Sequence, residues 1–325
     1  MQPSRSEVLE RERRWAMPVA LATLTSFALL VVGEIVVRSI SGEGPSEILE
    51  SAHTHSSAIT LSAILKAAAF VLLVAPLVYL FRAAQGRSPR VRGQLIGLII
   101  AAPLFLSGAS VLTAVATNDA ASEFVAGEAT TSFTLSEATE RCRSDRESDA
   151  GSFQDEHGAP GAGSLRRCAR TEVADEKAEE ALSSASTRSL AEGLGLGGRL
   201  GLAFALIYGC LWSMRTGLLT RFWGSLGMAM GVAAFLLLIQ FTFVWFLYFG
   251  LLVAGWVPGG RPPAWETGEA MPWPTPGEKA ASEIENGEIE NGDLDSPELP
   301  EGGVAGLGDL GENGEPRKRK ERGER

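Results

Sequence analysis

Residues 217–257 read GLLTRFWGSLGMAMGVAAFLLLIQFTFVWFLYFGLLVAGWV, and this stretch decides the fold class. Its only charged residue is Arg221, and no charged residue follows up to position 257. The hydrocarbon core of a bilayer is about 30 Å thick and is crossed by roughly 20 apolar residues in a helix. The stretch is therefore too long for one crossing and long enough for two, with a break near Gln240 that is inferred from length alone. A single crossing, with the remainder lying in the interface, is the alternative.

The rest of the chain shows the same separation of apolar and polar material. The 325 residues have an ordinary apolar fraction of 45%, but the apolar residues are gathered into long runs between polar, acidic and glycine-rich segments. This segregation is typical of integral membrane proteins, so the expected partner is the lipid bilayer. The net charge of −10 argues against a nucleic-acid partner, since nucleic-acid binding favours a basic surface.

Four further apolar runs precede the opening stretch. The first follows a charged, helix-favouring segment, 1–16, which we assign to the cytoplasm. A cleaved signal peptide is the alternative, but its apolar region spans only about 7–15 residues, and this run is longer. We therefore expect an all-α integral membrane protein with six transmembrane helices in a domain covering 17–257. The predicted spans are 17–37, 58–81, 95–116, 194–214, 218–238 and 241–257.

Charge predicts the orientation. Arginines are concentrated before the first run, between the second and third, and between the fourth and fifth. The loop between the first and second runs has three glutamates and no Lys or Arg after Arg38. Short loops with an excess of Lys and Arg stay cytoplasmic, whereas long loops cross the membrane largely regardless of charge. The predicted location is the cell membrane, with both termini cytoplasmic and the long loop 117–193 outside.

This outer loop is polar and is expected to contain two short helices. One begins near Thr134, where Glu137 three residues later fits a capping box, and the other covers about 171–184. Neither has an apolar face wide enough for a core. Cys142 and Cys168 both lie in this loop, on the side of the membrane where disulfides persist. We predict a disulfide between them; two unpaired thiols in a flexible loop are the alternative.

Residues 258–325 are predicted to form a cytoplasmic tail. Its first part, PGGRPPAWETGEAMPWPTPGEKA, is rich in proline and tryptophan and is expected to be extended. From about residue 275 the tail has almost no apolar surface to offset the entropy of ordering, so we expect it to be disordered.

The segment GLLTRFWGSLGMAMGVA resembles a stretch of uncharacterised bacterial multi-pass membrane proteins of the domain-of-unknown-function kind. In those proteins a helix opens with Gly-Leu, followed by a basic residue, an aromatic residue and a Gly-x-x-Gly pattern. The following GGRPPAWETGEAMPWP is similar to a tail segment of actinobacterial proteins of that kind. The resemblance implies the same six-span architecture and no assigned activity, and it does not extend to the cysteine-containing loop. The residues that carry it are Gly217, Leu218, Arg221, Gly224, Gly227 and 262–274.

Charged side chains inside the spans are the candidate functional residues. Each costs about 2.5–3.5 kcal/mol at mid-helix and therefore needs a partner. Lys66 lies roughly 12 Å below the outer end of its span at 1.5 Å per residue, and Glu34 lies near the outer end of the neighbouring span. Arg199 and Asp119 fall at a similar level. We hypothesise an outward-facing polar vestibule made by Glu34, Lys66, Asp119 and Arg199. The alternative is snorkelling, in which each long side chain reaches the headgroups.

Glu50, His53 and His55 form an E-x-x-H-x-H group in a loop assigned to the outside. Imidazole and carboxylate groups hold zinc or copper, so these three are weak candidates for metal ligands. Solvated or capping histidines are the favoured interpretation, because H-x-H pairs are common by chance. We predict no metal and no cofactor.

Small and aromatic residues in the spans are interpreted as packing features. Glycines four residues apart let helix backbones approach closely, which favours internal helix packing, with homo-oligomer formation through the same faces as the alternative. The pairs are Gly93 and Gly97, Gly193 and Gly197, Gly197 and Gly201, and Gly227 and Gly231. A group of aromatic residues is interpreted as lipid-facing and interfacial rather than as a cofactor site. Its members are Trp245, Phe246, Tyr248, Phe249 and Trp256.

The sequence contains no H-E-x-x-H, G-x-S-x-G or Walker motif, so an enzyme is not expected. The leading prediction is a structural or interaction protein of the cell membrane. The alternative is a small-solute transporter or channel that uses the vestibule. The two halves of the chain do not visibly match, and this weighs against a transporter built from inverted repeats.

Overall fold

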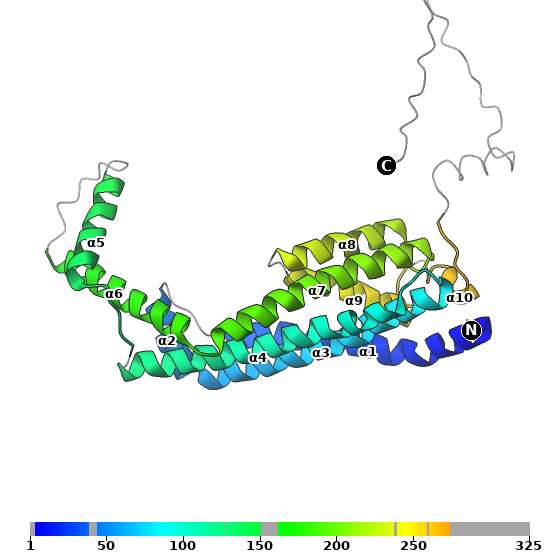
Figure 1. Cartoon of the computed structure of the whole chain (residues 1–325), viewed down its shortest axis with the longest axis horizontal. Coiled ribbons are helices and arrows are strands. Elements are labelled where there is room, and N and C mark those ends of the chain that lie inside the picture. Colours follow the sequence, from blue (N-terminus) through cyan, green and yellow to red (C-terminus); the bar gives the residue numbers. More distant parts are fainter. Residues whose placement is uncertain are drawn as a thin grey trace, which may run out of the picture. The chain divides into compact units, whose positions relative to one another are not determined.

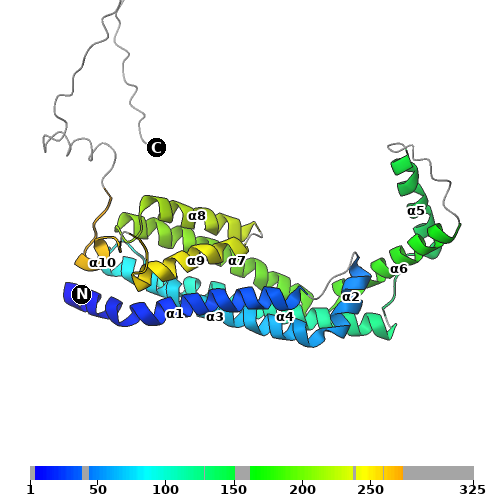
Figure 2. The same cartoon turned by 180° about the vertical axis from the view of Figure 1, so that it is seen from behind.

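The computed structural model describes residues 4–38, 44–127, 129–150, 162–236, 239–258 and 260–273, and within these ranges it contains helices and no strand (Figures 1 and 2). The all-helical class predicted from the sequence is confirmed. The tail predicted to be disordered from residue 275 lies outside the described residues. The elements are α1 (Arg5–Val37), α2 (Pro45–Thr54), α3 (Ser56–Arg87), η1 (Gly93–Leu95), α4 (Ile96–Ala126), α5 (Leu135–Ala150), α6 (Ala162–Ser184), α7 (Arg188–Arg215), α8 (Arg221–Phe235), α9 (Ile239–Ala254) and α10 (Ala264–Thr267).

Among the described residues, four helices are long and apolar enough to cross a membrane: α1, α3, α4 with the preceding η1, and α7. The shortest of them, α7, has 28 residues and is therefore about 42 Å long at 1.5 Å per residue, more than the hydrocarbon core requires. In both views these helices run side by side, α1 against α3, α3 against α4, and α4 against α7 (Figures 1 and 2). They contain the first four predicted spans and continue beyond them.

The extension of α1 has a local cause. Its N-cap is Ser4, whose backbone N–H donates to Glu7 Oε2 at 2.8 Å, while the Glu7 N–H donates to the serine hydroxyl. This capping box satisfies amide groups that have no partner inside the helix, so the helix begins well before the apolar run.

The fifth and sixth apolar runs fold as two shorter helices. α8 has 15 residues and α9 has 16, which makes them about 22 and 24 Å long, less than the thickness of the hydrocarbon core. α8 packs on α7, and α9 packs on α1 and on α8. The break predicted near Gln240 falls slightly earlier, between Phe235 and Ile239. The number of times that this stretch crosses a membrane stays a prediction. The structure therefore gives a helical hairpin here rather than two full-length spans.

The aromatic side chains of α9 are mostly in the core, so their interpretation as lipid-facing residues is wrong. Trp245, Phe246 and Phe249 are at most 2% exposed, and the Trp245 indole N–H donates to the carbonyl oxygen of Trp223 at 3.0 Å. Only Trp256, which is 60% exposed, has the surface position expected of an interfacial aromatic. Lipid-facing and core positions are both apolar in a membrane protein, and composition alone does not separate them.

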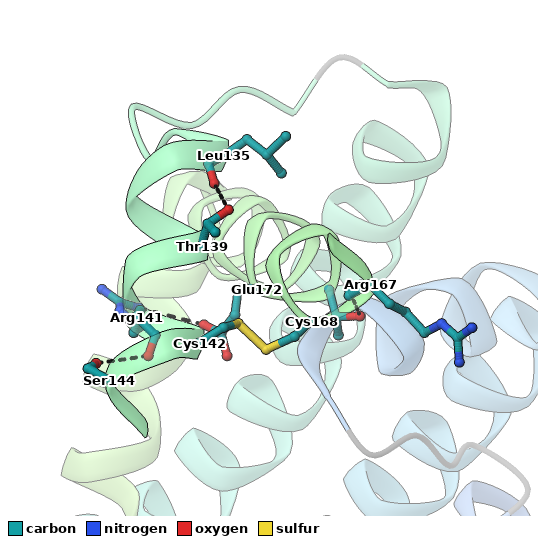
Figure 3. The surroundings of a disulfide bond; sticks show 9 residues. Leu135, Thr139, Arg141, Cys142, Ser144, Arg167, Cys168 and Glu172 are labelled. Carbon is teal, nitrogen blue, oxygen red and sulfur yellow. Dashed lines mark hydrogen bonds and ion pairs between the residues drawn. A yellow bond between two sulfur atoms is a disulfide. The ribbon is translucent and has the colours of Figure 1, made fainter. Parts of the chain in front are cut away.

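Outside the bundle, α5 and α6 are joined by the predicted disulfide between Cys142 and Cys168, with Cα atoms 6.3 Å apart (Figure 3). Arg141 on α5 lies 3.7 Å from Glu172 on α6, and Figure 3 shows this ion pair beside the disulfide. The two contacts fix the helices to each other. The helix predicted at 171–184 is the second half of α6, which begins earlier.

α6 also packs on the bundle, although we expected no core in this loop. Ala178 and Ala181 are buried against Leu49 and Ala52 of α2, a short helix that was not predicted from the sequence. Asp175 of α6 accepts hydrogen bonds from the backbone and hydroxyl of Ser46, the second residue of α2, at 2.9 and 2.6 Å. Alanine faces allow helices to approach closely, so a core made mostly of alanine forms around the buried Leu49.

The segment after α9 packs against the ends of the helices rather than extending away from them. The indole N–H of Trp265 donates to the carbonyl oxygen of Leu218 at 2.9 Å, and the N–H of Met271 donates to that of Thr216 at 3.1 Å. Gly217 has φ +74°, and a Cβ atom there would lie 2.0 Å from the Met271 carbonyl oxygen, so this turn requires glycine. The predicted extended segment is thus partly helical and held in place.

Candidate functional site

A cavity of about 560 Å³ lies among α1, α3, α4 and α7, bordered by α2 and by the first residues of α9. Its volume is within the range of small-molecule sites, about 300–1,000 Å³. The lining is mainly apolar, with a few hydroxyl groups and five charged or amide side chains. These five are Glu34, Lys66, Glu192, Arg199 and Gln240.

Glu34 and Lys66 form an ion pair across the contact between α1 and α3. Lys66 Nζ lies 3.0 Å from Glu34 Oε1, and the two side chains are partly exposed to the cavity, 24% for the lysine and 39% for the glutamate. Two features of the helix contact allow this pairing. Ser62 donates a hydrogen bond to the carbonyl oxygen of Gly33 at 2.9 Å, and a Cβ atom on Gly33 would lie only 3.3 Å from Lys66 Cγ. The close approach of the backbones therefore brings the two charges together.

Arg199 lines the same cavity from α7. It is half-buried, and within the described ranges of the chain it has no hydrogen-bond or ion-pair partner. The other acidic residue of the lining, Glu192, is bound to Arg188 at 2.8 Å. α7 is held close to α4 at Gly201, where a Cβ atom would lie 2.7 Å from that of Ala102. This approach sets Arg199 at the edge of the cavity.

Asp119, the fourth residue of the hypothesised vestibule, is exposed on α4 and does not line the cavity. It lies in the last two turns of that helix, beyond the apolar run. Asp119 was assigned to the vestibule from its distance to the end of the predicted span. Distance along a helix does not determine the direction in which a side chain points. The site therefore brings together Glu34, Lys66 and Arg199 and leaves Asp119 out.

The contribution of α9 was not predicted from the sequence. Ile239 and Gln240, its first two residues, line the cavity. Amide groups in the first turn of a helix have no partner within the helix and carry the positive end of its dipole. The sequence offered one signal for this contribution, the break expected in the middle of an apolar run. A helix that begins at mid-depth in a membrane has its first-turn amide groups away from water.

The three candidate metal ligands do not form a site. Glu50 and His53 line a separate hollow together with Lys177, whereas His55 Nδ1 lies 2.9 Å from the carbonyl oxygen of Ser51. Within the part of the chain that the structure describes, no three His, Cys, Asp or Glu side chains are arranged to share a metal ion. The E-x-x-H-x-H spacing does not bring the three side chains together, because α2 ends at Thr54, between the two histidines.

The glycine pairs divide into packed and open positions. Gly201, Gly227 and Gly231 are approached closely by neighbouring helices, as internal packing predicts. At Gly97 and Gly193 the position that a Cβ atom would take has no neighbouring atom within 4 Å. Contact with a second copy of the chain through these open positions stays a prediction.

A second ion pair, which is buried, lies at the other end of the bundle. Both carboxylate oxygens of Glu12 accept hydrogen bonds from the Arg87 guanidinium, with Nη2 and Oε2 2.9 Å apart. The side chains are 7% and 0% exposed. Neither residue was singled out from the sequence, because both lie in charged segments that read as solvated ends of spans. Their role is to join α1 and α3, and they do not line the cavity that holds Arg199.

Chemically, the cavity offers one neutralised pair, one unneutralised guanidinium and apolar walls. This set of groups can bind a small anion. Comparison of the chain with family models, with curated proteins and with solved structures found no match.

Proposed function

We propose that the protein is a membrane-embedded binding protein that takes a small anionic solute into the cavity among α1, α3, α4 and α7. The observation that carries this proposal is Arg199, a half-buried guanidinium without an acidic partner in the described chain, in a cavity of ligand size. A guanidinium keeps its charge in proteins and recognises carboxylate and phosphate groups through two parallel hydrogen bonds.

The balance of charges within the cavity supports an anion rather than a cation. The charge of Lys66 is balanced by Glu34 at 3.0 Å, and that of Glu192 by Arg188 at 2.8 Å. Arg199 is then the remaining charge, and the first amides of α9 add partial positive charge nearby. The apolar part of the lining favours a solute that also has a hydrocarbon portion.

For the topology we propose four full spans and the α8–α9 hairpin, with both termini in the cytoplasm. A hairpin returns the chain to the side from which it started, whether it crosses the membrane fully, as six spans require, or partly. The C-terminus then lies on the side of Arg215, in the basic link after α7, which the arginine distribution assigns to the cytoplasm. On this topology the cavity faces outward, and the solute is taken from outside.

Binding by the purified full-length protein in lipid nanodiscs tests the proposal. Isothermal titration with small carboxylates and phosphates is expected to find at least one anion that binds the wild type and binds Arg199→Gln about 10- to 100-fold more weakly, since a hydrogen bond to a charged group contributes about 1.5–3 kcal/mol. Arg215→Gln, on the same helix and outside the cavity, is the matched control and should bind normally. If every anion that binds does so equally well in Arg199→Gln, the proposal is wrong.

A structural or interaction role stays a second candidate, and the outer hairpin favours it. α5 and α6 are covalently joined outside the bundle, and α6 is fixed to α2 by Asp175 and Ser46. A rigid, polar projection of this kind suits contact with another protein. Cross-linking in intact cells through a photoreactive residue at Glu140, on α5, would trap such a partner.

A further inference from the structure

A second hollow, of about 700 Å³, lies over α3 between α1 and α4. Its walls are almost entirely apolar, and several of the side chains in them are open to the surroundings. Val71 is 47% exposed and Leu104 is 44% exposed. In a helix bundle that spans a membrane, an open apolar hollow on the outside of the bundle faces lipid chains rather than water. It shares no lining residue with the cavity that contains Arg199.

One end of this groove is basic. Arg11 of α1 and Arg82 of α3 line it, and neither has an acidic partner within the described ranges of the chain; Arg82 donates to Gln85 Oε1 at 3.3 Å. The one acidic residue of the lining, Glu12, is neutralised by its bidentate contact with Arg87. Trp15, 55% exposed, stands beside them as an interfacial aromatic does. The groove therefore combines a net positive end with an apolar length.

The length of the groove matches one leaflet. On α3 its lining begins at Val71 and reaches the basic end at Arg82. These two residues are eleven positions apart, about 16 Å at 1.5 Å per residue, and half of the hydrocarbon core is about 15 Å. A peptide or a small solute gives no reason for this coincidence, but an acyl chain that starts at the headgroup level and ends at the bilayer midplane does.

We propose that this groove binds a phospholipid with an anionic headgroup. The phosphate and headgroup lie between Arg11 and Arg82, and one acyl chain lies along Val71, Ala75 and Val78. On the proposed topology the lipid belongs to the cytoplasmic leaflet, where anionic lipids and basic side chains attract each other. The site is independent of the solute cavity, so the failure of either proposal leaves the other standing.

Native mass spectrometry of the full-length protein, released from mixed micelles containing phosphatidylglycerol or phosphatidylcholine, tests the proposal. The double variant Arg11→Gln with Arg82→Gln is expected to weaken retention of phosphatidylglycerol about thirtyfold. This factor corresponds to the binding free energy of two basic side chains near an anionic surface. Retention of phosphatidylcholine should change little. Arg13→Gln with Arg90→Gln removes the same charge from exposed positions outside the groove, and should lower phosphatidylglycerol retention much less.

A steric variant separates a groove from general surface charge. Ala75→Phe places a large side chain in the groove and keeps every arginine, and it is expected to lower the retention of both lipids. If Ala75→Phe loses its helical circular dichroism, Val71→Trp at the exposed part of the groove gives the same test. Equal loss of phosphatidylglycerol in the two double-arginine variants, or unchanged retention in a folded steric variant, would overturn the proposal.

Discussion

Replacing Arg87 by methionine is expected to be among the most destabilising single changes in this protein. The guanidinium is fully buried and binds both carboxylate oxygens of Glu12, and it also donates to the carbonyl oxygen of Ala264, from Nε at 3.1 Å and from Nη2 at 2.7 Å. It lies 5.5 Å from the centre of the Trp265 ring. One side chain thus joins α1, α3 and the segment that follows α9.

The magnitude follows from what the substitution leaves behind. Methionine fills much of the volume, but the Glu12 carboxylate remains buried without a cation, and removing one partner of a buried ion pair costs about 3–5 kcal/mol. Replacing both partners, with Glu12→Leu added to Arg87→Met, leaves no buried charge. The double variant is therefore expected to be more stable than Arg87→Met alone. A loss of about 1.5–3 kcal/mol remains from the guanidinium hydrogen bonds to the Ala264 carbonyl, which keeps its bond from the Gly268 N–H.

Unfolding of the detergent-solubilised protein, followed by circular dichroism, measures these free energies, and limited proteolysis reports whether residues 260–273 have been released. Arg90→Met, at an exposed position three residues further along the chain, is the control and should stay within about 0.5 kcal/mol of the wild type. A cost below about 1 kcal/mol for Arg87→Met would refute this account of the buried pair. Simple additivity of the effects of Glu12→Leu and Arg87→Met would refute it as well.

Three further predictions concern other parts of the chain. Cys168→Ser removes a cross-link between residues 26 positions apart and should destabilise the pair of helices α5 and α6 by about 3–4 kcal/mol on the chain-entropy account. Amide exchange should become faster in α5 and stay unchanged in α1, α3, α4 and α7; unchanged exchange in α5 would contradict this prediction. Gly227→Ala places a Cβ atom 2.3 Å from Cys210 Sγ and should cost about 1–3 kcal/mol in thermal unfolding, whereas Gly97→Ala, with open space around it, should cost nothing; the reverse order would count against the packing described. Hydrogen bonds from Thr134, the capping residue of α5, hold the pKa of Glu137 below its ordinary value. The ionised Glu137 therefore stabilises α5 fully above about pH 4.3, and this stabilisation is lost as the pH falls through the lowered pKa of the folded state. Amide exchange in the first turn of α5 should show this acid sensitivity in the wild type and not in Glu137→Gln.

Part of the candidate site could be read from the chain. Lys66 and Glu34 stand out because charges are costly in lipid, and consecutive helices of opposite direction are neighbours, so their pairing follows from two general rules. Asp119 fails the same reasoning because its helix turns it away from the cavity. The place of Gln240 and Ile239 in the cavity was beyond prediction. Run length indicated a break near Gln240, but it did not show that the helix beginning there lies at the cavity.

The sequence by itself determined that the chain is helical, where the four helices long and apolar enough to cross a membrane lie, and which two cysteines pair. These follow from run length against bilayer thickness and from the compartment that charge assigns to a loop, and both can be counted along the chain. Only the tertiary structure decided that the last apolar run is a short hairpin, that its aromatic residues are core, and that Glu12 and Arg87 are buried together. In lipid, core and surface positions are equally apolar, and a charge at the end of a span is solvated or buried according to which segment packs over it.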